Sequence, residues 1–508
     1  MNVGGSRLRA GFGENVHVSA ASFRVPLSSL LLAWLARRTW AGLVWLVRHP
    51  VLVGLAALAV YAWQVTATTG PMPVLVVTGL LVTALVGWRV AHPASFSRVL
   101  LARIRAGWRS RSVYSYWWQP AMVTGGLALT HAGTERLPRL LRVRSTGSVD
   151  VVRVRMLPGQ TVTDWTTAGP RLAQTFGLLD CRARTVPGRV HEVDLWCITY
   201  DPLTRTVAVP APATAASASA SSSAVSSSST GVDLAAVPVG RREDGRVFCL
   251  RILHTHLLVA GETGAGKGSV IWSVLCGLAP AIRGGVVRVW AIDPKGGMEL
   301  AFGAPLFNRF LYGGPTATGA AWQEATAELL EDAVRVMQER AARCRGVVRL
   351  HTPTTTEPLV LVVIDEVASL TAYVTDAAVR KRLAAALSLL LSQGRAVGVT
   401  VIAATQDARK EVLGMRDLFP TRIALRAAEA EQADMVLGAG ARVRGARTDQ
   451  ISDRTPGVGY VALDGVPEPV RVRFAHVTDD HIATVVKAYA PDTLTNGAVV
   501  PTADGVMA

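Results

Sequence analysis

The stretch Gly261-Glu262-Thr263-Gly264-Ala265-Gly266-Lys267 decides the fold of this chain. It follows the apolar run 257–260 and precedes residues 269–275, whose composition predicts a helix. A strand, a glycine-rich turn, a lysine and a helix in this order are typical of a phosphate-binding loop. The glycines let backbone N–H groups converge, and the helix N-terminus adds positive potential. We therefore expect residues 261–269 to cradle the phosphates of a nucleotide, with Lys267 neutralising the β- and γ-phosphates.

A second motif lies about a hundred residues further on. The apolar run 359–364 has the character of a buried strand and ends in Asp365-Glu366. Parallel sheets bind ligands at the carboxyl ends of their strands, so these two carboxylates are expected beside the loop. Asp365 is then the candidate to orient Mg²⁺, and Glu366 is the candidate to activate the attacking water. Together the motifs predict a protein that binds and hydrolyses a nucleoside triphosphate.

One residue departs from the usual loop. The position after the lysine normally holds Ser or Thr, whose hydroxyl binds Mg²⁺. Here it is Gly268, and Ser269 follows it. Two interpretations remain open: Ser269 supplies the hydroxyl from one residue further on, or Mg²⁺ is held by phosphate, water and Asp365 alone.

Strands and helices alternate through the C-terminal half, which predicts an α/β fold. Expected strands at 286–292, 359–364 and 399–404 are interleaved with expected helices at 321–343 and 379–392. The first of these strands ends in Asp293-Pro294-Lys295, and the last ends in Thr405-Gln406. Gln406 is the candidate to hydrogen-bond the attacking water or the γ-phosphate and to report its presence.

Charge and cysteine content restrict the partners and the compartment. The net charge of the 508 residues is +16, and most basic residues are arginine. Such an excess suits phosphate-rich partners, either nucleic acid or anionic lipid. The five cysteines are scattered without metal-ligand spacing, which is typical of reduced thiols in a cytoplasmic protein.

Two apolar runs, 51–65 and 74–88, predict a transmembrane helical hairpin. Arginines flank both outer ends, whereas the connection 66–73 carries no charge. This pattern predicts that both ends of the hairpin lie in the cytoplasm. The protein is then expected in the cell membrane, with its motor domain in the cytoplasm. The apolar run 27–47 is interrupted by Arg37-Arg38 and is expected to lie on the membrane surface. The alternative is a pair of buried helices in a soluble domain.

The remaining segments give a domain plan. Alternating residues at 142–144 and 152–155, helical spacing at 161–176 and a strand at 190–198 predict a small α+β adaptor domain. Gly169-Pro170 allows this helix to be split in two. The Ala/Ser-rich segment after it is expected to be a flexible linker. The plan is an N-terminal tail with an interfacial helix (1–48), a two-span hairpin (49–91), a basic juxtamembrane segment (92–139), the adaptor (140–210), the linker (211–231), the motor (232–485) and a polar tail (486–508).

Five blocks in the motor carry a resemblance to a known family. They are GETGAGKGS (261–269), IDPKGG (292–297), LVVIDEVASL (361–370), GRAVGVTVIAATQ (394–406) and FPTRIALR (419–426). Their order and spacing resemble the FtsK/SpoIIIE family of DNA translocases, and the Gly268-Ser269 variant resembles its actinobacterial Tra-like branch of conjugal transfer proteins. The resemblance implies a RecA-like motor that assembles as a homo-hexamer around double-stranded DNA, moves it with ATP and Mg²⁺, and works with accessory transfer proteins.

Departures from the family pattern favour one activity. The division translocases of this family usually carry four spans and a C-terminal winged-helix module, whereas this chain has two predicted spans and only a short helix after its last strands. Transfer of DNA of an integrative or conjugative element between cells is therefore favoured over chromosome segregation. The sequence also leaves open a type VII protein-secretion ATPase and a membrane-tethered scaffold. An arginine finger would come from a neighbouring subunit, with Arg340, Arg343, Arg422 and Arg426 as candidates.

Overall fold

The structure is a computed structural model that describes residues 50–131, 134–209, 231–313, 320–407, 409 and 414–491. The predicted interfacial helix, the Ala/Ser-rich segment 211–230 and most of the C-terminal tail lie outside the described residues. The chain divides into two compact units, Met1–Ser97 and Arg98–Ala508. Each unit is described by itself.

The described part of the first unit, residues 50–97, contains three α-helices. They are α2 (Pro50–Thr69), α3 (Met72–Ala91) and the short α4 (Pro93–Phe96). Helices α2 and α3 cover the two apolar runs of the sequence, as predicted. Helix α3 is long and apolar enough to cross a membrane, and none of its side chains is buried. Length and composition support one membrane-crossing helix in the described part of the chain, and the two-span topology stays a proposal.

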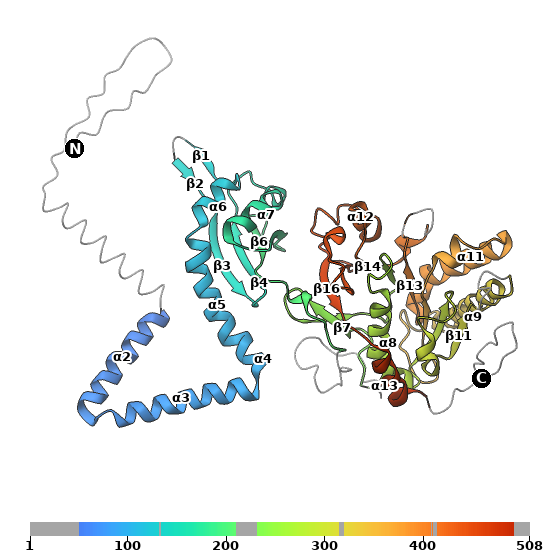
Figure 1. The fold of residues 1–508 in the computed structure, drawn as a ribbon, viewed down its shortest axis with the longest axis horizontal. Coiled ribbons are helices and arrows are strands. Elements are labelled where there is room, and N and C mark those ends of the chain that lie inside the picture. The colour runs from blue at the N-terminus through green and yellow to red at the C-terminus, as the bar shows by residue number, and fades with distance from the viewer. Residues whose placement is uncertain are drawn as a thin grey trace, which may run out of the picture. The chain divides into compact units, whose positions relative to one another are not determined.

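The adaptor forms the first part of the second unit. It has a four-stranded antiparallel sheet of order β3-β4-β6-β5, and helix α7 (Val162–Phe176) packs against this sheet (Figure 1). The predicted strands are confirmed within β3, β4 and β6, and the predicted helix runs unbroken through Pro170, capped by Thr161 and Asp164. The elements are η1 (Ser97–Leu101), α5 (Ala102–Arg109), η2 (Ser110–Ser115), α6 (Trp118–Thr124), β1 (Leu129–His131), β2 (Thr134–Arg136), β3 (Arg139–Ser145), β4 (Val149–Arg155), α7 (Val162–Phe176), β5 (Asp180–Thr185), β6 (Glu192–Ile198) and η3 (Pro202–Thr204).

Residues before position 140 also belong to the adaptor core. Tyr114, Trp118 and Met122 are buried against α7 and the sheet. The hydroxyl of Tyr114 donates to Asp150 Oδ2 at 2.8 Å, and Arg109 pairs with the same carboxylate. The arginine-rich segment therefore packs onto the adaptor through Tyr114, Trp118 and Met122 and through the ion pair of Arg109 with the buried Asp150. The predicted domain boundary at residue 140 stays a proposal.

The motor is built on one ten-stranded sheet of order β11-β10-β12-β13-β9-β14-β15-β16-β7-β8. The first six strands of this order are parallel, and the last four are antiparallel. The parallel strands are β9 (Leu257–Ala260), β10 (Val287–Asp293), β11 (Arg309–Tyr312), β12 (Leu359–Ile364), β13 (Val399–Thr405) and β14 (Thr421–Leu425). The antiparallel strands are β7 (Val237–Arg242), β8 (Val247–Leu250), β15 (Val458–Ala462) and β16 (Val470–Phe474).

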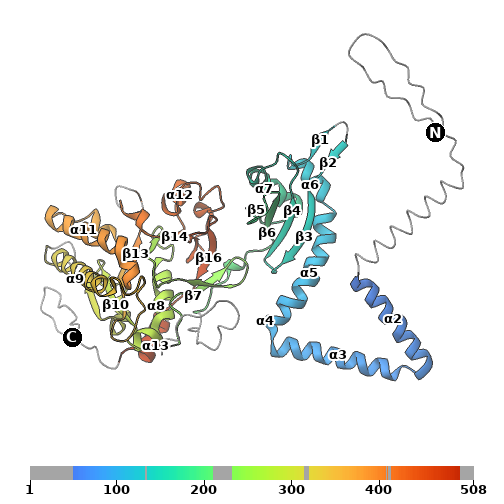
Figure 2. The same ribbon diagram turned by 180° about the vertical axis from the view of Figure 1, so that it is seen from behind.

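Helices cover both faces of this sheet. One face packs on α8 (Lys267–Arg283) and α13 (Asp479–Tyr489), and the other packs on α9 (Ala320–Cys344) and α11 (Ala377–Gln393), as Figures 1 and 2 show. Strands β9, β12 and β13 are buried along their whole length because both of their faces are covered, and they are largely apolar. The short elements are η5 (Ala301–Leu306), α10 (Ala368–Thr371), η6 (Gly394–Val397), η7 (Arg416–Leu418), α12 (Glu431–Leu437) and η8 (Thr448–Gln450). The predicted α/β fold is confirmed.

Candidate nucleotide-binding site

The glycine-rich loop joins β9 to α8, as the sequence predicts. Gly264 and Gly266 adopt left-handed backbone angles, with φ of 74° and 98°. A Cβ at Gly266 would also lie 2.4 Å from the backbone nitrogen of Gly457. Glycine at 266 is therefore required by the turn and by the close approach of a second chain segment. The loop ends at the N-terminus of the seventeen-residue helix α8, which directs positive potential at the cradle.

Lys267 is folded back over its own loop. Its side chain is buried, and Nζ donates to the carbonyl oxygens of Gly261 at 2.8 Å and Glu262 at 3.2 Å. Burial lowers the pKa of Lys267, while the charges of Glu366 and Asp365 oppose this shift. The ammonium group is thus held inside the cradle by neutral carbonyls, where phosphate oxygens would offer it charged partners.

The two predicted carboxylates lie at the carboxyl end of β12, close to the loop. Asp365 Oδ2 lies 2.8 Å from Lys295 Nζ, and Glu366 Oε2 lies 3.8 Å from the same nitrogen. Burial, as the largest influence, would lower the pKa of Lys295, but its hydrogen bond to Asp365 and the charges of Asp365, Glu366 and Asp293 outweigh it and raise the pKa. Lys295 is therefore the cation that this pair of acids binds in the structure.

Glu366 has the environment of a general base. Its side chain is buried, Oε1 accepts the Gln406 backbone N–H at 3.3 Å, and Oε2 has no hydrogen-bond partner among the residues that the structure describes. Burial raises the pKa of Glu366, although Lys295 and Lys267 counteract it. A buried carboxylate with one oxygen held by a hydrogen bond and the other in a long ion pair with Lys295 can accept a proton from a water molecule placed beside it.

Gln406 lies between the carboxylate and the loop. Strand β13 is inserted between β9 and β12, so its last residues lie between the two motifs. The Gln406 side-chain oxygen accepts a hydrogen bond from the Thr263 hydroxyl at 3.1 Å, and its backbone N–H binds Glu366. Gln406 thus connects the phosphate loop to the candidate base, as a residue that senses the γ-phosphate would have to do.

The turn after β10 adds acidic groups to the site. Asp293 Oδ2 accepts the backbone N–H groups of Glu299 and Leu300 at 3.0 Å each, which fixes the turn that carries Lys295 and Glu299. Burial and the charges of Asp365 and Asp293 raise the pKa of Glu299. The sequence singled out the Asp-Pro-Lys run at this strand end but assigned it no role, and it missed Glu299. The sequence did contain one signal for it, the glycine at position 268. The space that a Ser or Thr side chain normally takes there must be filled by another residue.

The site fits the nucleotide and the Mg²⁺ that the motifs predict. Mg²⁺ and phosphate would satisfy three groups: a Glu366 oxygen without a hydrogen bond in the described part of the chain, the Asp365 carboxylate, and Lys267, which donates to loop carbonyls. Ser269 is placed at the side of α8 that faces Gly457, its Cβ 3.7 Å from the position of a Cβ at that glycine. Its role as a metal ligand stays a proposal.

The candidate arginines have different surroundings. Arg340 is buried, and its guanidinium donates to the carbonyls of Val397, Gly398 and Pro358, so it stabilises the protein interior. Arg426 Nε lies 2.7 Å from Glu262 Oε1 in the loop itself. The two others pair with acids at the surface, Arg343 with Glu357 at 2.8 Å and Arg422 with Asp417 at 3.4 Å. Arg340 is thereby removed from the set available to a neighbouring subunit.

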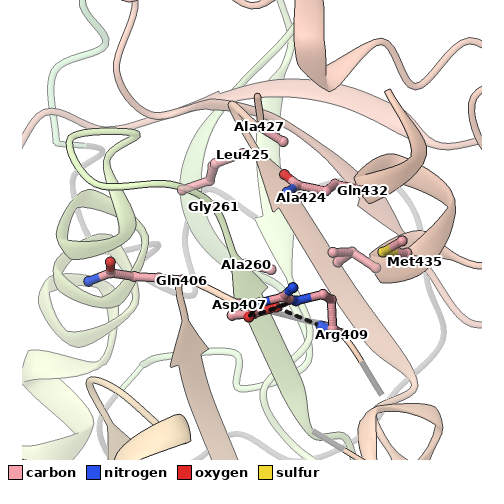
Figure 3. A pocket seen from close by; sticks show the side chains of 11 residues that line it. Ala260, Gly261, Gln406, Asp407, Arg409, Ala424, Leu425, Ala427, Gln432 and Met435 are labelled. Atoms are coloured by element: carbon pink, nitrogen blue, oxygen red, sulfur yellow. Dashed lines mark hydrogen bonds and ion pairs between the residues drawn. The ribbon is translucent and has the colours of Figure 1, made fainter. Parts of the chain in front are cut away.

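A small cavity lies beside the loop. It is lined by residues at the ends of β9, β13 and β14 and by α12, among them Gly261, Asp407 and Met435 (Figure 3). Its volume of about 20 Å³ suits roughly one water molecule, which excludes a nucleotide. Figure 3 shows Gln406 directed away from Met435 and Gln432. The cavity shares Gly261 and Gln406 with the candidate site, but it is too small to hold the nucleotide itself.

Known proteins resemble this chain over the motor and beyond it. Residues 225–455 match the FtsK/SpoIIIE family. The transfer protein TraSA of Streptomyces ambofaciens is 28% identical over 384 residues, which cover 71% of this chain and 84% of TraSA. The DNA translocase FtsK of Corynebacterium efficiens is 26% identical over 251 residues, which cover 46% of this chain and 25% of that protein. The chain thus spans about a quarter of the length of this translocase.

Among solved structures, the pCW3 conjugation coupling protein TcpA, in its monomer form with ATPγS, has a TM-score of 0.44 at 17% identity. This likeness covers 73% of this chain and 98% of that one. The family resemblance predicted from the five sequence blocks is confirmed by the match of residues 225–455 and by the similarity to TraSA. This segment of the chain forms a domain of the FtsK/SpoIIIE family.

Proposed function

We propose that this protein is a membrane-anchored, ATP-dependent translocase of double-stranded DNA, which transfers DNA of an integrative or conjugative element between cells. The observation that carries the proposal is the meeting of Lys267, Asp365, Glu366 and Gln406 at the carboxyl edge of one parallel sheet. The family of the domain and the name of the DNA translocase FtsK support the choice of DNA as the cargo, and the name of the transfer protein TraSA supports transfer as the activity.

The residues of the site divide the chemical work. Lys267 and the loop N–H groups bind the β- and γ-phosphates, Asp365 holds Mg²⁺, and Glu366 takes a proton from the attacking water. Bound Mg²⁺ supplies positive charge against the phosphate oxygens. Gln406 connects the loop and Glu366 through Thr263, so a change at the γ-phosphate position would reach the base directly.

The membrane anchor is the second part of the proposal. Helices α2 and α3 would form two spans with a short external connection, because arginines flank both outer ends of the pair. The motor would then lie in the cytoplasm as a homo-hexamer that contacts accessory transfer proteins. A cysteine introduced at Gly70, between the two helices, should react with an impermeant thiol reagent added outside intact cells. A cysteine at Ser112 should react only after lysis.

Movement along the duplex is the property to test first. The full chain in detergent micelles should displace a triplex-forming strand from duplex DNA with ATP and Mg²⁺, and duplex DNA should stimulate its ATPase. Stimulation by a polypeptide signal but not by DNA would favour a secretion ATPase. Absence of any turnover would favour a tethered scaffold and would contradict the proposal.

Glu366→Gln is expected to retain ATP binding and to lose turnover. The amide cannot accept the proton, and general-base catalysis typically contributes about 10²–10⁴-fold to the rate. Bound ATP should then accumulate, and the fraction of protein bound to DNA should rise in a filter-binding assay. Asp376→Asn, at the N-cap of α11, is a matched control that removes an acid outside the site. Hydrolysis at the parent rate by Glu366→Gln would contradict the assignment of the base.

A further inference from the structure

Gly268 stands where phosphate-binding loops normally carry a hydroxyl side chain. Its backbone does not adopt the left-handed angles that call for glycine, unlike that of Gly266. A Cβ at 268 would instead lie 1.8 Å from Oε1 and 2.7 Å from Cδ of Glu299. The space of the absent side chain is therefore occupied by the carboxylate of Glu299.

Glu299 is held at this position from its backbone. Its N–H donates to Asp293 Oδ2 at 3.0 Å, and its carbonyl accepts the indole N–H of Trp272 on α8 at 3.2 Å. Its half-buried carboxylate forms no hydrogen bond or ion pair with any part of the chain that the structure describes. Lys295 pairs with Asp365 and Glu366 instead. The start of α8 thus faces an anchored carboxylate that forms no direct ion pair within the described residues, although Lys295 and Lys267 are close enough to interact with its charge.

We propose that Glu299 replaces the missing loop hydroxyl and binds the nucleotide-associated Mg²⁺ together with Asp365, either directly or through a metal-bound water. The inference rests on the proposed nucleotide binding. Mg²⁺ in nucleotide sites is typically bound by one or two carboxylates, with phosphates and waters completing its shell. Ser269, the alternative donor, faces Gly457 on another side of α8. Two acids and the phosphates then suffice without any residue-268 side chain.

The test measures metal dependence apart from turnover. Binding of a fluorescent ATPγS analogue to the full chain in detergent is titrated with Mg²⁺ and compared with binding in EDTA. Glu299→Gln should raise the half-saturating Mg²⁺ concentration on the order of 10–100-fold, as losses around a metal typically do. Nucleotide affinity in EDTA should stay within about twofold of the parent, because the phosphate loop and Lys267 are unchanged.

A second pair of variants separates a metal ligand from a packing residue. Gly268→Ser alone forces the Glu299 carboxylate away and should impair the Mg²⁺ response as Glu299→Gln does. Gly268→Ser combined with Glu299→Ala has room for the hydroxyl and should recover most of that response. Recovery supports the proposal whatever the effect of each single change on folding.

Four results would overturn the inference. An unchanged Mg²⁺ requirement in Glu299→Gln, or an equal loss of affinity with and without Mg²⁺, would reject Glu299 as a metal ligand while nucleotide binding itself stands. Failure of the double variant to recover would reject the replacement of a hydroxyl. A parent protein that binds no nucleotide at any Mg²⁺ concentration would reject both this inference and the proposed function.

Discussion

The two halves of the ten-stranded motor sheet do different work. In the parallel half, β9, β12 and β13 end at the same edge, and their last residues meet around Lys267, Glu366 and Gln406. In the antiparallel half, strand ends alternate between the two edges, so no common set of side chains can form there. That half instead contacts the adaptor through buried ion pairs.

The contacts of the antiparallel half are specific. Glu243, in the turn after β7, lies 3.1 Å from Arg182 and 3.5 Å from Arg184 of the adaptor strand β5. Arg471 of β16 pairs with Asp201 at 2.7 Å, just after the adaptor sheet. Strand direction thus decides the use of each half: parallel strands build a binding edge, and antiparallel strands provide a docking face.

The largest effect is expected from removing the lysine of the parallel half. Lys267→Ala should reduce nucleotide affinity by about 100-fold or more, since charge-assisted bonds to phosphate contribute about 1.5–3 kcal/mol each. ATP hydrolysis should fall below detection. Equilibrium binding of a fluorescent ATP analogue to the full chain measures the loss.

The matched control is Lys381→Ala, an exposed lysine on α11. It should bind nucleotide as the parent does. The thermal unfolding midpoint without nucleotide should be similar in both variants, because the hydrogen bonds of the Lys267 ammonium within the described residues go to carbonyls of its own loop. Retained nucleotide binding by Lys267→Ala would mean that the parallel edge is not the binding edge.

The sequence predicted the parallel half well because its signals are local. Glycines, a lysine and acids follow apolar runs directly, and a chain with both sheet faces covered shows continuous apolar strands. The prediction that Gln406 ends a strand next to that of Glu366 agrees with the pairing of β13 with β12. The placement of Lys267, Asp365, Glu366 and Gln406 around one edge agrees with that interpretation, and their roles remain proposals.

The parts that sequence could not predict depend on contacts between distant segments. Glu299 enters the space beside Gly268 from thirty-one positions away, and no local pattern marks that meeting. Glu243 looks like a solvated turn residue in sequence but is buried by Arg182 and Arg184. The packing of the helices before residue 140 onto the adaptor could not be predicted for the same reason. Their many arginines are typical of an exposed segment, although Tyr114 is buried in the adaptor core.

Replacing the buried acid Glu243 should weaken the contact between the antiparallel half of the sheet and the adaptor. Glu243→Gln leaves Arg182 and Arg184 without their shared carboxylate, and breaking a buried pair in this way typically costs about 3–5 kcal/mol. We expect a lower thermal unfolding midpoint of the full chain and faster protease cleavage between the adaptor and the motor. Nucleotide affinity should be unchanged, because the parallel edge is intact.

Asp464→Asn provides the comparison for that variant. This acid is exposed in the loop after β15, on the same half of the sheet. Its thermal unfolding midpoint should equal that of the parent protein. If Glu243→Gln also leaves the midpoint and the cleavage rate unchanged, the ion pairs do not stabilise the docking face, and the contrast between the two halves of the sheet loses its energetic basis.

The smallest effect on stability is expected at the amino ends of the parallel strands, the edge opposite the candidate nucleotide site. His256 precedes β9, is fully buried, and accepts the Val401 N–H on Nδ1 at 3.0 Å. Burial and the charge of Arg395 lower the pKa of His256 from 6.5 to about 4. The unfolded chain therefore binds a proton between these values that the folded chain does not, so stability is full above pH 6.5 and falls as the pH is lowered toward 4.

At about pH 5 this single group should destabilise the motor by about 2 kcal/mol relative to neutral pH. His256→Asn keeps an acceptor for Val401 but cannot titrate. It should therefore unfold earlier than the parent at about pH 7.5, because of lost packing, yet lose less of its midpoint on moving to about pH 5. His191→Asn, which removes an exposed histidine, should show the parent's full pH dependence. An identical acid shift in His256→Asn would mean that the amino edge carries no buried titrating group, and that acid sensitivity originates elsewhere in the motor.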